Sequence, residues 1–93
     1  MRFVWDENKN RANRAKHHIA FETAVRVFED PSLLMRPESV RDGEERWQSL
    51  GYVRNALLAV THTYRKYGGE DVCRIISART ATSHERHLYE EDP

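Results

Sequence analysis

Three runs in the second half of the chain, rich in apolar, aromatic and β-branched side chains, predict β-strands. They cover residues 46–53, 56–64 and 71–78, and this composition between short polar segments is typical of strands. The segments between them, "RN" at 54–55 and "KYGGE" at 66–70, have the length of hairpin connections. We therefore predict an antiparallel meander in this half of the chain.

The first half of the chain predicts a short strand followed by two helices. An apolar run at 3–5 precedes Asp6, which is a good N-cap for a helix from Glu7 to about His17. Apolar residues then recur at helical spacing and predict a second, amphipathic helix over residues 20–29. The sequence "EDP" ends this helix because proline cannot continue it.

A fourth strand in the meander and a third helix complete the predicted elements. Residues 32–35 form a short apolar run, and we expect residues 36–45 to be a polar connection with turn residues. Thr82 and Glu85 have the spacing of a capping box, so "SHERHLYEE" is predicted to be a helix. The resulting order predicts an α+β fold, with two N-terminal helices and one C-terminal helix packed on a mostly antiparallel sheet.

Composition indicates a single soluble domain, residues 1–93, with an unevenly charged surface. Hydrophobic residues make up 39% of the chain, which is too many for a disordered protein even though 32% of residues are charged. The formal net charge is zero, yet residues 46–89 contain seven basic and three acidic side chains, and residues 22–45 contain three and seven. This segregation predicts one surface that attracts a polyanion and another that meets a basic partner.

Cysteine, histidine and hydropathy exclude several classes of protein. The single Cys73 excludes an internal disulfide, and no cysteine or histidine cluster has the spacing of a zinc site. His84 and His87, at i and i+3 on the last predicted helix, have no obvious third metal ligand. The chain lacks a run of about 18 apolar residues, and its polar N-terminus does not fit a signal peptide. We therefore expect a cytoplasmic protein without a membrane span.

The last predicted strand contains two arginines, in the sequence "RIISAR". Period two places Arg74 and Arg79 on opposite faces unless a bulge intervenes, so we do not expect them to serve one site. Arg79 lies where the strand gives way to a helix, a position from which a guanidinium can bind phosphate. An ion pair with Glu85 or with the acidic segment 38–45 would explain Arg79 equally well. Arg74 fits a structural role, with its stem packed and its charge in solvent.

Other residues could supply positive charge and proton transfer. Arg46 and Arg65 lie at strand ends that a meander can bring to one rim, where clustered arginines would stabilise a pentacoordinate phosphate. Lys16 and His17 could bind phosphate and transfer a proton. Their place in the last turn of a helix has a second explanation, because the helix dipole favours cations there.

The last helix and the aromatic residues leave similar alternatives open. Glu85 and Tyr89, at i and i+4, could act as acid or base, and the alternative role of Glu85 is the capping box. Four aromatic residues could stack on bases or pack in the core. These are Trp5, Trp47, Tyr52 and Tyr64.

Three segments resemble the BrnT family of ribonuclease toxins from bacterial type II toxin-antitoxin systems. They are "WDENKNRANRAKHHIAFETAVRVFEDP", "DGEERWQSLG" and "RIISARTATSHERHLYEE", which follow the family's order and span nearly the whole chain. The resemblance implies a RelE-like fold, cleavage of RNA without a metal or other cofactor, and neutralisation by a BrnA-like antitoxin with a ribbon-helix-helix domain. Operator DNA would be bound only through the antitoxin complex, and a toxin homodimer or a two-to-two complex is expected.

The resemblance also implies roles for particular residues. In a metal-free ribonuclease the ribose 2′-hydroxyl attacks its own phosphate, so the protein orients the strand, helps to move a proton and stabilises the phosphorane. On this basis the expected catalytic residues are Arg79 and Arg65 for charge stabilisation, and His17 or Glu85 for proton transfer. The expected substrate-binding residues are Lys16, Arg46, Arg74, Arg86 and Tyr89.

Two residues depart from the family pattern, and two other functional classes remain open. His18 stands where glycine is usual, which would strain a left-handed helix end. Glu38 and Ser39 stand where we expect an acidic residue followed by an arginine, and Ser39 lacks the phosphate contact that such an arginine could make. A non-catalytic module that binds nucleic acid or a partner would need the same arginines as a nuclease. A purely structural partner would tolerate reversal of the basic residues without losing RNA affinity or toxicity.

Overall fold

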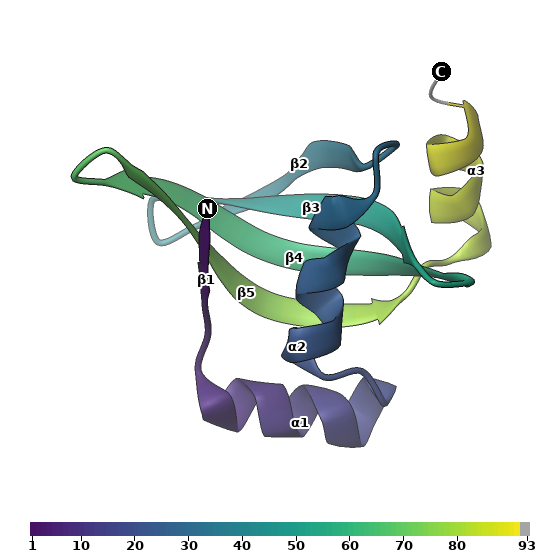
Figure 1. The fold of residues 1–93 in the computed structure, drawn as a ribbon, viewed down its shortest axis with the longest axis horizontal. Helices are drawn as coiled ribbons and strands as arrows, with labels where there is room; N and C mark the ends of the chain where they lie inside the picture. The colour runs from purple at the N-terminus through teal and green to yellow at the C-terminus, as the bar shows by residue number, and fades with distance from the viewer. Residues whose placement is uncertain (92–93) are drawn as a thin grey trace.

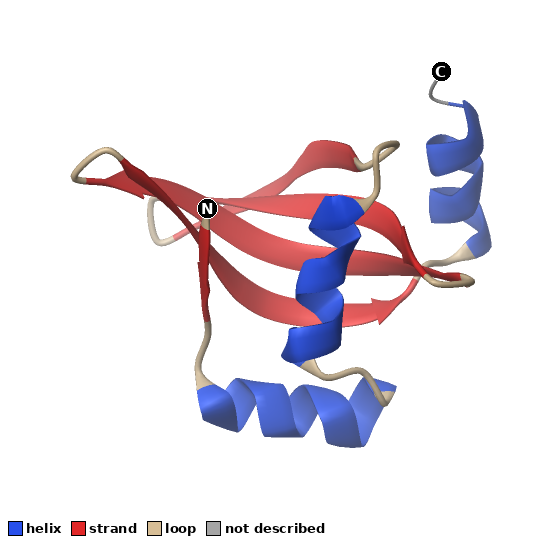
Figure 2. Ribbon diagram, in the orientation of Figure 1, coloured by secondary structure: helices blue, strands red, loops and turns tan. Residues whose placement is uncertain are grey.

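Five strands form one mostly antiparallel sheet (Figures 1 and 2). The computed structural model describes residues 1–91. The strands are β1 (Arg2–Val4), β2 (Leu34–Arg41), β3 (Glu44–Val53), β4 (Ala56–Tyr67) and β5 (Glu70–Thr80). Their order across the sheet is β1-β5-β4-β3-β2; β1 runs parallel to β5, and the other neighbours are antiparallel. The predicted meander and the α+β class are confirmed.

Helices precede and follow the meander (Figure 2). They are α1 (Glu7–His17), α2 (Phe21–Ala24) with its 3-10 continuation η1 (Val25–Glu29), and α3 (Ser83–Glu91). The segment 20–29, predicted as one helix, therefore changes helix type in its middle. No helix of the described chain is long and apolar enough to cross a membrane.

The core lies between the sheet and the segment formed by α2 and η1, which crosses one face of the sheet that we call the helix face (Figure 1). Phe21, Ala24 and Val27 are fully buried there. The strand residues that share this core are Val53, Leu58, Val60, Cys73, Ile75 and Ala78. A Cβ on Gly51 would lie 2.9 Å from the carbonyl oxygen of Val27, so this glycine permits the close approach of η1 to β3.

The segment 36–45 is a strand and a tight turn, and our prediction of a polar connection is wrong. β2 pairs with β3 from Leu34 to Arg41, and the chain reverses at Asp42 and Gly43, whose φ angles are 52° and 75°. Two residues with positive φ form the hairpin turn that Asp-Gly favours. The prediction failed because an edge strand with solvent on one face needs few apolar residues.

A β-bulge in β5 changes which side chains share a face. Ile76 is an extra residue between two positions that pair with consecutive residues of β4. Arg74 pairs with Thr63 and Arg79 pairs with Ala59. These two partners lie four positions apart on β4 and share a face, so both arginines point to the same face. Our expectation that they lie on opposite faces is wrong, and the bulge is the physical reason.

A buried asparagine attaches α1 to β5. β1 pairs with β5 only at residues 72–74, and beyond them Asn13 takes the place of a neighbouring strand. Its Nδ2 donates to the carbonyl of Ala78 at 2.8 Å, and its Oδ1 accepts from the N–H of Ala78 at 3.0 Å. These two bonds satisfy the N–H and the carbonyl of Ala78, which would otherwise have no hydrogen-bonding partner at this edge of the sheet.

The end of α1 keeps the left-handed geometry that glycine usually adopts. His18 has φ 62°, and its N–H donates to the carbonyl of Arg14 at 2.9 Å. A left-handed backbone costs a residue other than glycine roughly 1 kcal/mol. The departure from glycine at this position therefore adds strain without changing the helix exit.

Candidate functional site

The sheet face opposite α2 and η1, which we call the open face, carries arginines from all five strands. By register these are Arg2 on β1, Arg36 and Arg41 on β2, Arg46 on β3, Arg65 on β4, and Arg74 and Arg79 on β5. The carboxylates on the same face are Glu38 of β2, Glu44 of β3, Glu70 of β5, which binds Arg2, and Glu85 of α3. Arginines thus outnumber carboxylates here, although the formal net charge of the chain is zero.

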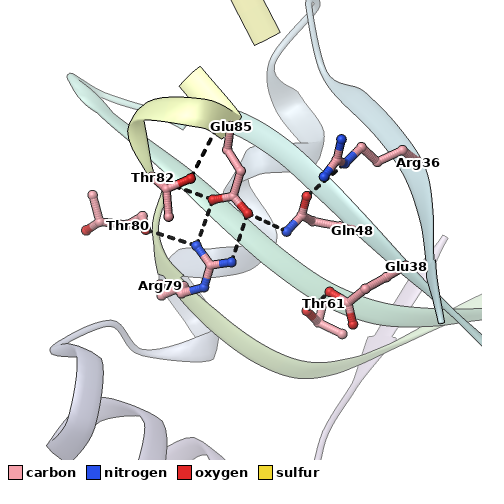
Figure 3. Close-up of polar contacts among 8 residues, drawn as sticks. All are labelled: Arg36, Glu38, Gln48, Thr61, Arg79, Thr80, Thr82 and Glu85. Atoms are coloured by element: carbon pink, nitrogen blue, oxygen red, sulfur yellow. Dashed lines mark hydrogen bonds and ion pairs between the residues drawn. The ribbon is translucent and has the colours of Figure 1, made fainter. Parts of the chain in front are cut away.

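A buried carboxylate connects one end of the open face to α3 (Figure 3). Glu85 is only 6% exposed, and it accepts from Arg79 through both oxygens, at 2.7 Å from Nη1 and 2.8 Å from Nη2. Gln48 Nε2 donates to Glu85 at 2.9 Å, and Gln48 Oε1 accepts from Arg36 Nε at 3.0 Å. We call this chain of contacts the Glu85 network; it links β5, α3, β3 and β2.

The Glu85 network holds its central carboxyl in the ionised form. Hydrogen bonding to Arg79 lowers the pKa of Glu85 to about 2, although burial acts in the opposite direction. The predicted capping box is present, since the Thr82 N–H donates to Glu85 at 2.9 Å and the Glu85 N–H donates to Thr82 Oγ1 at 3.2 Å. A carboxylate this acidic is a weak proton acceptor, and its geometry suits a residue that holds Arg79 in place.

A second carboxylate, Glu44, binds two arginines at the other end of the open face. Its Oε2 lies 2.9 Å from Arg65 Nη2, and its Oε1 accepts from Arg74 Nη2. Arg65 lies six positions along β4 from the residue that pairs with Arg79, so about 20 Å of strand separates the two arginines. The structure does not bring Arg65 and Arg79 to one phosphate, as joint stabilisation of a phosphorane would require.

Arg46 lies between the Glu85 network and the group of Glu44, Arg65 and Arg74, which we call the Glu44 cluster. Arg46 has no hydrogen-bonding or ionic partner in the described part of the chain. Its Nε is buried without an acceptor, which is a costly arrangement for a polar atom. Arg41 also forms no ion pair with a described residue, and Arg36 contacts only the neutral Gln48. These three unpaired arginines on β2 and β3 can accept an anion without first releasing a carboxylate.

A bulge in β2 places Glu38 above the middle of the open face. The register of β2 shifts between Pro37 and Ser39, which makes Glu38 the extra residue. Its Oε2 accepts from Thr61 Oγ1 at 2.9 Å, so the side chain reaches from β2 across β3 to β4. Glu38, Arg36 and the Glu85 network lie on the same side of the sheet (Figure 3).

No role for Arg36, Glu38 or Gln48 was predicted from the sequence. The first two were assigned to a connection, and the Asp-Gly dipeptide at 42–43 was the signal that could have identified a strand before it. Gln48 shows no comparable signal, because its role depends on the pairing of β2, β3 and α3.

Lys16 and His17 lie in the last turn of α1, beside the bulged edge of β5. With Ile76 and Ser77 they line a shallow hollow of about 230 Å³. Ser77 belongs to the open face by register, so the end of α1 borders that face. In the described chain neither side chain forms a hydrogen bond or ion pair with the Glu85 network.

Arg86 and Tyr89 face the end of β3 instead of the centre of the open face. Arg86 Nη1 donates to the hydroxyl of Tyr52 at 2.8 Å, and the Tyr89 hydroxyl donates to Asp30 at 2.7 Å. The Tyr52 and Tyr89 rings pack edge to face with centroids 5.4 Å apart. Burial, together with the bond to Asp30, raises the pKa of Tyr89 to about 12. These contacts attach α3 to the sheet.

The remaining candidates for chemistry have structural explanations. His62 is buried with Nε2 2.8 Å from Ser49 Oγ, and burial lowers its pKa. His84 and His87 are exposed, and among residues 1–91 no group of three histidine, cysteine, aspartate or glutamate side chains could hold a metal ion. Trp5 packs against the core of the helix face.

A comparison with protein-family models finds a match over residues 5–85. The matching family is described as the ribonuclease toxin BrnT of type II toxin-antitoxin systems. The match includes Glu38, Glu44 and the whole Glu85 network, and it ends at Glu85, inside α3. A search of curated proteins finds no match.

Proposed function

Because the chain belongs to the BrnT family of ribonuclease toxins of type II toxin-antitoxin systems, we propose that its open face binds RNA and cleaves it without a metal ion. The ribose 2′-hydroxyl attacks the adjacent phosphorus and the 5′-oxygen of the next nucleotide leaves, which produces a 2′,3′-cyclic phosphate. The protein supplies strand orientation, proton transfer and stabilisation of the phosphorane.

The observation that best supports this proposal is the set of unpaired arginines on β2 and β3. Arg36, Arg41 and Arg46 have no carboxylate partner in the described chain. Guanidinium groups bind phosphate oxygens through parallel hydrogen bonds. A polyanionic strand laid across β2 and β3 therefore gains these contacts without losing an existing ion pair.

We assign stabilisation of the phosphorane to Arg79 and phosphate binding to Arg46. Both Nη atoms of Arg79 donate to Glu85, which leaves its Nε for a phosphate oxygen and fixes the orientation of the group. A donor held in advance of the reaction stabilises developing charge without reorganisation. Glu85 is then a positioning residue, and its low pKa argues against the role of proton acceptor.

The other expected site residues take more distant roles in this proposal. Arg65 and Arg74 stay bound to Glu44, and they meet phosphates further along the strand only if RNA opens these ion pairs. Lys16 and His17 contact RNA where it passes the edge of β5, and His17 stays a candidate for proton transfer there. Arg86 and Tyr89, expected to bind substrate, instead fix the position of α3 and hence of Glu85.

The family implies an antitoxin partner. We propose that this partner is a BrnA-like protein with a ribbon-helix-helix domain, that it covers the basic open face, and that operator DNA is bound only by the complex. A RelE-like fold, a homodimer or two-to-two complex, a cytoplasmic location and growth arrest without antitoxin belong to the same proposal.

Cleavage of RNA by the purified chain, freed of antitoxin and treated with EDTA, tests the proposed activity. We expect fragments that end in a 2′,3′-cyclic phosphate. Arg79→Ala should slow cleavage by about 10²-fold or more, the usual effect of removing one preorganised donor. Arg26→Ala removes an exposed arginine of η1 and is the matched control, which should cleave at the wild-type rate.

The outcomes separate the proposal from its alternative. Circular dichroism and thermal melting must first show that Arg79→Ala is folded; Arg79→Lys, which keeps the charge, replaces it otherwise. Equal cleavage rates for this variant and the wild type would remove Arg79 from the mechanism. Binding of free and ribosome-bound RNA without any cleavage would identify a non-catalytic binding module, which uses the same arginines.

A further inference from the structure

Glu38 differs from the other carboxylates of the open face because it forms no ion pair in the described part of the chain. Glu44 and Glu85 each bind arginine through both oxygens. Glu38 is exposed and accepts a single hydrogen bond, through Oε2, from the neutral hydroxyl of Thr61. Its Oε1 therefore remains available to accept a proton from a ligand.

The bulge in β2 gives Glu38 this position. In an uninterrupted strand, residues 38 and 39 would point to opposite faces. Ser39 pairs with Arg46, which belongs to the open face, and Glu38 reaches Thr61 on that same face. Bulges commonly redirect a side chain beside an active site, and this one brings a carboxylate over the centre of an arginine-rich surface.

Arginines from several elements point to the side of the sheet on which Glu38 lies. Arg36 lies two positions before it on β2, and Arg46 lies opposite the bulge on β3. Arg79 reaches the same side of the sheet from β5, with Glu85 of α3 bound to it (Figure 3). Hydrogen bonding to Glu85 raises the pKa of Arg79, and the charge of Glu38 adds to this effect, so the two groups are within electrostatic reach.

We infer that Glu38 is the general base that takes the proton from the ribose 2′-hydroxyl, an inference that rests on the function proposed above. A carboxylate oxygen of Glu38 removes the proton as the O2′–P bond forms. The P–O5′ bond breaks, and the 5′-oxygen takes a proton from water. The resulting hydroxide recovers the proton from Glu38, so the products are a 2′,3′-cyclic phosphate, a 5′-hydroxyl and the original carboxylate.

The first test compares Glu38→Gln with Glu45→Gln in single-turnover cleavage of a mixed-sequence single-stranded RNA. Glu45 is exposed, lies on the same hairpin and pairs with Val40 on the helix face, so it is a matched control. Glu38→Gln should lower the cleavage rate by about 10²- to 10³-fold, the range of general base catalysis. Its affinity for 2′-O-methyl RNA, which cannot be cleaved, should not fall, because the change removes a negative charge.

The pH profile and a modified substrate identify the role of the carboxylate. A carboxylate base acts only in its ionised form, so the wild-type pH–rate profile should have an acidic limb, in which the rate rises with pH, and Glu38→Gln should lack it. A bridging 5′-phosphorothiolate has a leaving group that needs no protonation, so it restores activity to variants that lack a general acid but not to those that lack a general base. Glu38→Gln should therefore remain slow on this substrate.

Each outcome has a separate meaning. If the wild type cleaves no RNA, free or ribosome-bound, the proposed function fails together with this inference. If the wild type cleaves and Glu38→Gln is equally fast, or keeps the acidic limb, only the assignment of Glu38 fails. Rescue by the phosphorothiolate would make Glu38 the general acid and would also overturn the inference.

Discussion

Glu85 shows how one buried side chain sets the position of Arg79, the arginine to which we assign catalysis. It is bound by Arg79 and Gln48 and also receives the N–H of Thr82. Burying an ion pair costs desolvation energy that the mutual attraction of the charges repays only when the remaining polar atoms are satisfied. Both oxygens of Glu85 are satisfied, so the pair can hold Arg79 rigidly at the junction of β5 and α3.

Glu85 should make the stability of the fold depend on pH in acidic solution. Its pKa falls from 4.5 to about 2 on folding, so the unfolded chain binds this proton more readily than the folded chain. The contribution is fully present above about pH 5, is lost as the pH falls toward 2, and amounts to about 3 kcal/mol. Urea unfolding from pH 7 to pH 2 should show this loss for the wild type.

Two variants make the pH prediction specific. Glu85→Gln should be less stable than the wild type at neutral pH and should show a flatter dependence between pH 5 and pH 2. Glu45→Gln, which removes an exposed carboxylate, should keep the wild-type dependence. If Glu85→Gln loses as much stability on acidification as the wild type, other carboxylates account for the acid sensitivity.

What the sequence could predict about these residues depended on how local each interaction is. The capping box between Thr82 and Glu85 is visible from spacing alone, because both partners lie within one helical turn. The bonds from Gln48 to Arg36 and Glu85 join three elements that are distant in the chain. Such a contact leaves no periodic pattern in the sequence. Some residues of the candidate site could therefore be named from the sequence, whereas Gln48, which connects Arg36 to Glu85, could not.

Among the elements, β2 and β5 show that one inserted residue decides which side chains share a site. A shift of one position transfers every later side chain to the other face of a strand. The meander was predicted correctly from strand-like runs and the short segments between them, but Ile75 and Ile76 are both apolar, so the pattern gave no indication of which is extra. β2 contains few apolar residues, so neither the strand nor its bulge could be predicted from its composition. The position of Glu38 on the open face was missed for the same reason.

The docking of α1 on β5 should depend on Asn13 more than on any apolar contact of that helix. Asn13→Ala leaves the N–H and the carbonyl of Ala78 without their partners and also removes a bond to Ile19. Unsatisfied buried backbone groups cost about 1–3 kcal/mol each. We expect Asn13→Ala to lower the free energy of unfolding by about 2–3 kcal/mol, measured by urea denaturation at neutral pH.

The control for this variant lies on the same helix. Asn8 is exposed, and Asn8→Ala should change the free energy of unfolding by less than about 0.5 kcal/mol. If the two variants have equal stability, water replaces Asn13 at the edge of β5 and the helix is held by other contacts. Hydrogen exchange at the Ala78 amide would then be unchanged, whereas our prediction requires it to become faster in Asn13→Ala.

Over the whole molecule, the main apolar cluster and most of the arginines lie on opposite faces of the sheet. The helix face buries that cluster, although Leu50 and Leu57 are buried on the open face. The open face has an excess of arginine in a chain whose formal net charge is zero. Such segregation favours attraction of a polyanion to one side of the protein. The carboxylates of the Glu44 cluster and the Glu85 network neutralise some of the arginines on that face. The positive charge that the face presents to RNA therefore depends on whether RNA displaces these carboxylates.

The salt dependence of RNA binding should measure how many arginines are free. Each phosphate neutralised on a single strand contributes about −0.7 to the slope of log K against log salt concentration. The three unpaired arginines together with Lys16 predict a slope of about −3, and participation of the three arginines that bind Glu44 or Glu85 would steepen it to about −5. We expect about −3 by fluorescence anisotropy with 2′-O-methyl RNA, because ion pairs that stay intact release no counterions. Arg46→Ala should make the slope less steep by about 0.7, whereas Arg65→Ala should leave it unchanged. A slope of about −5 that becomes less steep in Arg65→Ala would show that RNA opens the Glu44 cluster.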